Sequence, residues 1–176
     1  MENFKEESVG VLFDTAKTEY THEQDRSALI DSKVNIALPI IAAFFLAVAG
    51  QCAFFKISGL PTSNFGEFLQ GGSLFLLYSI SVIFSGLATA WMVRAIYPRN
   101  YQAINSMHFY NEALLKEEPN IIKIEVIRYF IEANATNKDQ NDLRMKLYSR
   151  GWLWAAISAG AFVFYIILYN IIMKGA

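Results

Sequence analysis

Residues 151–173 read GWLWAAISAGAFVFYIILYNIIM and give the clearest indication of the fold class. It contains no charged residue, and about 20 mainly apolar helical residues suffice to cross a bilayer. Two further stretches without a charge run from Val34 to Phe55 and from Phe68 to Val93. Their apolar residues surround a helix on every side, whereas a buried helix of a soluble bundle carries a polar stripe. The sequence therefore predicts an all-α integral membrane protein with three transmembrane helices.

The composition supports this class and excludes others. Of the 176 residues 54% are apolar, above the roughly 45–50% of a soluble domain. The acidic leader before the first apolar stretch does not resemble a cleavable signal peptide. The single cysteine, Cys52, has no partner for an intramolecular disulfide, and with a net charge of −1 and mixed signs no nucleic acid polymer is expected as a partner.

The distribution of Lys and Arg orients the helices, because basic residues that flank membrane helices prefer the cytoplasm. Four precede the first apolar stretch, one lies between the first and second, and nine lie between the second and third. The amino terminus is therefore expected in the cytoplasm, with Lys174 as the one basic residue that violates the rule. The predicted segments are a cytoplasmic leader 1–33, a transmembrane helix 34–55, an outer loop 56–67, a transmembrane helix 68–96, a cytoplasmic helical segment 97–150 and a transmembrane helix 151–173.

The leader is predicted to be an amphipathic helix. One stripe of apolar residues recurs at spacings of three and four: Val9, Leu12, Phe13, Ala16 and Tyr20. We expect this stripe to pack against the inner segment. The alternative is a helix lying in the plane of the membrane, although its many acidic residues would be repelled by anionic headgroups.

The inner segment 97–150 is predicted to form a helical hairpin. Pro98 and Pro119 break the helix, because proline lacks the backbone N–H and disfavours helical geometry in the residue before it. A first helix is expected over 103–117. From Asn120 onward the apolar residues Ile124, Ile127, Ile131, Leu143 and Leu147 suggest one long helix that continues into the third apolar stretch, unless the polar residues 134–142 form a turn.

The hairpin carries one polar face that could bind a ligand. Asn134, Asn137, Asn141 and Arg144 recur at spacings of three and four, a pattern that suits a nucleotide or a lipid headgroup. A solvated helix face is the simpler interpretation, and we expect it. The chain shows no phosphate-binding loop, no metal-ligand spacing and no nucleophile–base set, so no catalytic residue, metal or cofactor is expected and the protein is not predicted to be an enzyme.

Small and hydroxyl residues mark faces of the second and third apolar stretches. Ser81, Ser85 and Thr89 lie four apart, and Ala155 with Ala159 and Ala156 with Gly160 form two rows. Such residues let helices approach closely, or line a pore once several copies assemble. We expect ordinary packing within the chain. A pore would require a homo-oligomer, because three helices cannot enclose an aqueous path.

The junction between the leader and the first apolar stretch resembles a known family. Its carriers are Arg26, Leu29, Asp31 and Lys33, an Arg followed by Leu-x-Asp-x-Lys before a membrane helix. With the helical inner segment, residues 12–39 resemble the Pycsar effectors, membrane effectors of bacterial cyclic-pyrimidine antiphage signalling. The resemblance implies an inner-membrane protein that a cyclic nucleotide or another infection signal triggers to oligomerise and permeabilise the membrane.

A second function fits the same sequence. The chain could be a non-conducting membrane anchor or immunity-type subunit whose inner helices bind a cytoplasmic protein. The effector would be toxic on forced expression, whereas the anchor would be harmless and would co-purify with its partner.

Overall fold

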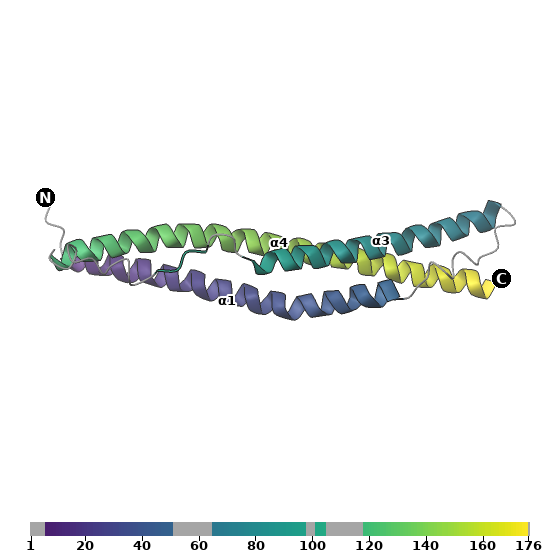
Figure 1. Cartoon of the computed structure of the whole chain (residues 1–176), viewed down its shortest axis with the longest axis horizontal. Coiled ribbons are helices and arrows are strands. Elements are labelled where there is room, and N and C mark those ends of the chain that lie inside the picture. The colour runs from purple at the N-terminus through teal and green to yellow at the C-terminus, as the bar shows by residue number, and fades with distance from the viewer. Residues whose placement is uncertain (1–5, 51–64, 98–100, 105–117, 176) are drawn as a thin grey trace. The chain divides into compact units, whose positions relative to one another are not determined.

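The described part of the chain is built from helices. The structure is a computed structural model that describes residues 6–50, 65–97, 101–104 and 118–175. Within these ranges the helices are α1 (Glu6–Gly50), α3 (Phe65–Ile96) and α4 (Pro119–Gly175) (Figure 1). The prediction of an all-α fold is confirmed for these residues. The predicted outer loop 56–67 lies outside the described residues up to residue 64.

Each of the three helices is long and apolar enough to cross a membrane. α1 has 45 residues and α4 has 57, so at 1.5 Å per residue they measure about 68 Å and about 86 Å. The hydrocarbon core of a bilayer is only about 30 Å thick. Both helices therefore continue far beyond their apolar parts.

The leader and the first apolar stretch form one helix. α1 runs through the predicted boundary at residues 33 and 34 and also through Pro39. Glu6 and Glu7 in its first turn favour its start, because carboxylates stabilise the positive end of the helix dipole. The boundary between these segments is one of side-chain polarity, and the backbone does not break there.

α4 is likewise continuous. Pro119 occupies its first position, where the missing N–H costs nothing, and the N–H of Ile121 donates to the carbonyl of Glu118 at 2.9 Å. The polar residues 134–142 are helical, so the alternative of a turn is excluded. The expected helix over 103–117 is wrong at its start, because residues 101–104 are not helical. Residues 105–117 lie outside the described residues.

The chain divides into two compact units. The polar unit comprises residues 1–32 and 97–145, and the apolar unit comprises residues 33–96 and 146–176. α1 and α4 each pass from one unit into the other without a break in the helix. α3 belongs to the apolar unit.

In the apolar unit α3 runs antiparallel to α4. Along α3, Tyr78 lies against Tyr165, Ser81 contacts Ser158, and Phe84 stacks on Trp154 with their ring centroids 4.9 Å apart. The residue numbers of the partners on α4 therefore fall as those on α3 rise. One core cluster joins all three helices, with Ala37 and Ile41 of α1, Ala88 and Met92 of α3, and Trp154 and Ala155 of α4. The buried residues of α3 recur at heptad-like spacings, which is typical of left-handed coiled-coil packing: Leu74, Ser81, Ser85, Ala88, Met92 and Ala95.

Gly151 allows the close approach of α3 and α4 at one point. A Cβ atom on Gly151 would lie 2.9 Å from Cε of Met92. Gly160, nine residues further along the same helix, has nothing within 4 Å of such a Cβ. Only the first of these two glycines is therefore required by packing within the chain.

Candidate functional site

In the polar unit α1 and α4 lie side by side and parallel. The residue pairs that join them by side-chain hydrogen bonds differ in number by 113 to 118 along the whole contact. A nearly constant offset means that both helices rise together. Buried residues recur at spacings of three, four and seven on α1, as in a coiled coil: Val9, Ala16, Tyr20, Glu23 and Ile30.

The part of this helix pair nearest the start of both helices has an apolar core. Val9 and Ala16 of α1 pack with Ile127 of α4, and the rings of Phe13 and Phe130 meet edge to face at 5.9 Å. The prediction that the leader stripe packs against the inner segment is confirmed. Leu12 is the exception, because it is half exposed.

Further along, the core becomes polar. The amide of Asn141 donates to the backbone carbonyl of Glu23 and to its carboxylate, both at 2.9 Å. The guanidinium of Arg144 donates to Ser27 at 2.7 Å and to the carboxylate of Asp31. Asn141 is fully buried and Arg144 is 2% exposed. Polar groups in such positions fix which residues of two helices lie opposite each other, because any shift leaves them unpaired.

Arg26 adds a second cross-link at the edge of this core. It donates to the carboxylate of Asp142 at 2.5 Å and lies 3.5 Å from that of Glu23. The hydrogen bond to Asp142 is the largest cause of a raised pKa of Arg26. The contact with Asp142 therefore favours the charged form of the guanidinium.

Two side chains clamp the segment 101–104, which is not helical. Asn137 is fully buried and pairs with the backbone of Gln102 twice, accepting from its N–H at 2.8 Å and donating to its C=O at 3.0 Å. The hydroxyl of Tyr20 accepts from the N–H of Ile104 at 3.1 Å. We call Tyr20 and Asn137 the clamp. It satisfies backbone groups of a segment that has no helix or sheet partner of its own.

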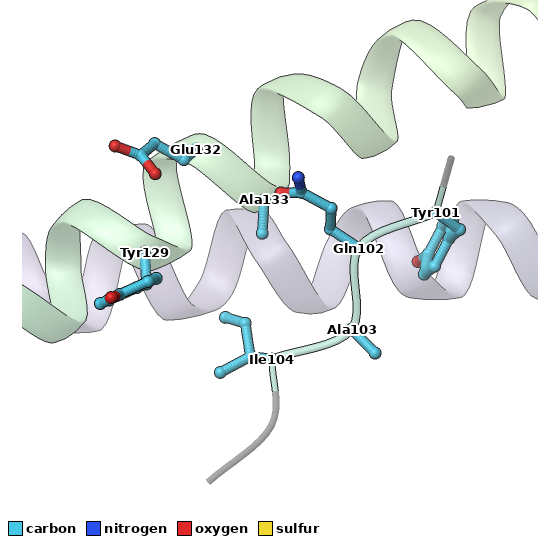
Figure 2. A pocket seen from close by; sticks show the side chains of 7 residues that line it. All are labelled: Tyr101, Gln102, Ala103, Ile104, Tyr129, Glu132 and Ala133. Atoms are coloured by element: carbon cyan, nitrogen blue, oxygen red, sulfur yellow. The ribbon is translucent and has the colours of Figure 1, made fainter. Parts of the chain in front are cut away.

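A pocket of about 390 Å³ lies beside the clamped segment. Figure 2 shows the segment from Tyr101 to Ile104 next to the turn of α4 that carries Tyr129, Glu132 and Ala133. Burial raises the pKa of Tyr101, so its hydroxyl remains a proton donor at neutral pH. Of the described residues that line the pocket, Glu132 alone is charged, and its carboxylate disfavours a phosphate there.

The expectation of a solvated polar face is wrong for three of its four residues. Asn137, Asn141 and Arg144 are buried and face α1 or the clamped segment, while Asn134 is half-buried and donates to Glu19 at 3.3 Å. The side-chain carbonyls of Asn134 and Asn141 meet no donor within the described ranges. The face is therefore an internal contact of the polar unit.

The family-like motif is split by the structure. Arg26 and Asp31 pair with residues of α4, whereas Leu29 is 54% exposed and Lys33 is exposed. The partners Glu23, Ser27 and Asp142 were not singled out from the sequence. For Glu23 and Ser27 the sequence did contain a signal. Both lie at the spacing of three and four residues that continues the heptad-like pattern from Tyr20 to Ile30.

The hydroxyl residues of the apolar unit are internal. Ser81 and Ser85 are fully buried, and Ser81 donates to the carbonyl of Ser158, which donates in return to the carbonyl of Ser81. Thr89 donates to the carbonyl of Ser85 on its own helix. Within one chain these residues serve helix packing.

The two rows of small residues on α4 differ in environment. Ala155 and Ala159 are half-buried, and Ala155 packs on the three-helix core cluster. Ala156 and Gly160 are exposed. One row therefore contributes to packing within the chain, and the other lies on its surface.

Neither metal chemistry nor a known relative points to a function. Within the described ranges, no group of three or more His, Cys, Asp or Glu side chains could hold a metal ion. Comparison of the chain with protein-family models, with curated proteins and with solved structures gives no match.

Proposed function

We propose that the protein is a multi-pass protein of the bacterial inner membrane, with the apolar unit in the bilayer and the polar unit in the cytoplasm. Its support is the outward-facing apolar surface. In the most apolar window of each helix only 17–22% of the residues are buried, and side chains such as Leu46, Ile83 and Phe164 are at least 60% exposed. Exposing such surface to water costs about 25 cal/mol per Å², so lipid is its natural environment. The excess of Lys and Arg in the polar unit supports its location on the cytoplasmic side.

Its activity is that of a regulated effector. A trigger that acts on the polar unit changes the packing of the apolar helices, and several copies then assemble and permeabilise the membrane in defence against phage. One observation carries this proposal: α1 and α4 each run through both units as single helices. A continuous helix transmits a shift or rotation along its length, whereas a flexible linker would absorb it. The resemblance to Pycsar effectors supports the same activity.

The trigger is more readily a cytoplasmic protein than a cyclic nucleotide. Asn137, Asn141 and Arg144 already bond to groups of the chain itself. Among the described residues that line the pocket beside the segment 101–104, Glu132 presents a carboxylate and none carries a positive charge. These residues offer a nucleotide phosphate no cation, whereas exposed apolar residues such as Val11, Leu12 and Ile131 offer a protein contact.

The second candidate is a non-conducting anchor or interaction subunit. The burial of Ser81 and Ser85 favours it, because hydroxyls that bond within the chain are not available to line a pore. In this role the polar unit binds a partner at the membrane and the apolar unit only holds it there.

Induced expression separates these two functions. The wild-type chain is expressed with and without the neighbouring genes, and membrane potential and dye entry are followed. The effector predicts depolarisation and dye entry in at least one condition, and it predicts that Arg144→Met alters the onset while Leu143→Ala does not. Intact membranes in every condition, together with a co-purified protein partner, would establish the anchor instead.

A further inference from the structure

Two arginines of the apolar unit share one tryptophan ring. The guanidinium carbon of Arg94 lies 5.5 Å from the ring centroid of Trp91, and that of Arg150 lies 5.4 Å from it. Arg94 is in the last turn of α3 and Arg150 is on α4, so the contact joins two helices. Both arginines are exposed and the ring is half-buried. Arginine stacks well on an aromatic ring, and this contact leaves its N–H groups free to bond elsewhere.

These two arginines differ from the others that the structure describes. Arg26, Arg128 and Arg144 each form an ion pair with a carboxylate. Neither Arg94 nor Arg150 has a carboxylate within ion-pair distance in the described part of the chain. Two like charges gathered at one ring repel each other, so an anion from outside the chain would stabilise them.

The apolar unit supplies no anion near this pair. Its sequence contains one acidic residue, Glu67, in the first turn of α3, while Lys33 and Lys146 add further positive charge. Glu67 and Arg94 lie near opposite ends of α3, about 40 Å apart at 1.5 Å per residue. The charge at Trp91 is therefore unbalanced by the unit itself.

We propose that Trp91, Arg94 and Arg150 form a binding site for the phosphate of an anionic phospholipid headgroup. The proposal rests on the membrane location proposed above. Arg94 follows the charge-free stretch that ends at Val93, and Arg150 precedes the one that begins at Gly151, so both stand where acyl chains give way to headgroups. Guanidinium groups donate two parallel hydrogen bonds to a phosphate, and an indole ring suits this depth of the bilayer. Free phosphate has the same chemistry, and the test separates the two sources.

The test measures the melting temperature of the purified full chain in a neutral detergent. Phosphatidylglycerol, phosphatidylcholine or inorganic phosphate is added to the wild-type chain, to the double variant Arg94→Gln with Arg150→Gln, and to Arg128→Gln as a control that removes an exposed arginine elsewhere. Phosphatidylglycerol should raise the wild-type melting temperature by roughly 5–10 °C, the shift expected near 100-fold above Kd for a chain of this size. The double variant should lose most of this rise, and the control should keep it.

If phosphatidylglycerol and phosphatidylcholine raise the melting temperature of the wild-type chain equally, the proposal is overturned. This comparison does not need a folded double variant. An undiminished shift in a folded double variant would also overturn it, and an equal shift from inorganic phosphate would assign the site to free phosphate. Alkaline carbonate extraction tests the membrane location separately from the phosphate site. A chain that leaves the membrane fraction contradicts the membrane location, whereas a chain that stays but shows no lipid preference contradicts the phosphate site only.

Discussion

At the scale of single residues, the ion pair between Arg144 and Asp31 has two unequal partners. The side chain of Arg144 is 2% exposed and that of Asp31 is 49% exposed. Removal of the carboxylate leaves a buried positive charge short of its counter-ion, which costs about 3–5 kcal/mol, whereas removal of the guanidinium leaves a carboxylate that water can solvate. We therefore expect Asp31→Ala to destabilise the polar unit more than Arg144→Met in thermal unfolding, with Leu143→Ala close to wild type. Equal losses from both variants would show that the burial of Arg144 does not determine the energetics.

The clamp gives a second prediction at this scale. The amide of Gln102 is protected by the side-chain carbonyl of Asn137, and that hydrogen bond contributes about 1 kcal/mol. Asn137→Ala should therefore speed hydrogen exchange at Gln102 by about tenfold or less, because 1.4 kcal/mol corresponds to a factor of ten. Asp139→Ala, on the exposed side of the same helix, serves as the control. Unchanged exchange at Gln102 in a folded Asn137→Ala chain would contradict the clamp.

At the scale of helices, the two glycines of α4 provide a matched pair. Gly151→Leu must displace Met92 or push α3 away, and overpacking of this kind costs about 1–3 kcal/mol. Gly160→Leu meets open space and should leave the melting temperature of the monomer nearly unchanged. If the exposed row of Ala156 and Gly160 joins copies of the chain, Gly160→Leu should weaken the oligomer in native mass spectrometry while Gly151→Leu lowers stability. A similar loss of monomer stability in both variants would refute the assigned packing.

The helices could be predicted from the sequence better than their buried faces could. Length and apolar content identify all three helices, and the leader stripe correctly marks the contact with Ile127. On α4 the apolar residues correctly predict one long helix but do not mark its buried face, because Ile124, Ile131 and Leu143 are exposed while Asn137 and Asn141 are buried. Hydrophobicity reports burial only where the core is apolar. In the polar unit the hydrogen bonds between α1 and α4 join residues more than 110 positions apart, which spacing along one helix does not reveal.

At the scale of the whole molecule, two long helices join a unit with a polar core to a unit with an apolar surface. In the described part of the apolar unit most side-chain hydrogen bonds run from a hydroxyl to the backbone, as between Ser81 and Ser158, and they need no water. In the polar unit they involve charged groups that suit an aqueous environment. This difference in the chemistry of the two units supports the proposal that the apolar unit lies in lipid and the polar unit in water.

Cysteine labelling in intact cells tests this placement most directly. In a Cys52→Ser background, single cysteines replace Thr62 in the predicted outer loop and Asp139 in the polar unit, and a membrane-impermeant maleimide is added. We expect the cysteine at position 62 to be labelled in intact cells and the one at position 139 to be labelled only after the membrane is permeabilised. Labelling of position 139 in intact cells, or recovery of both labelled chains in the soluble fraction, would overturn this placement.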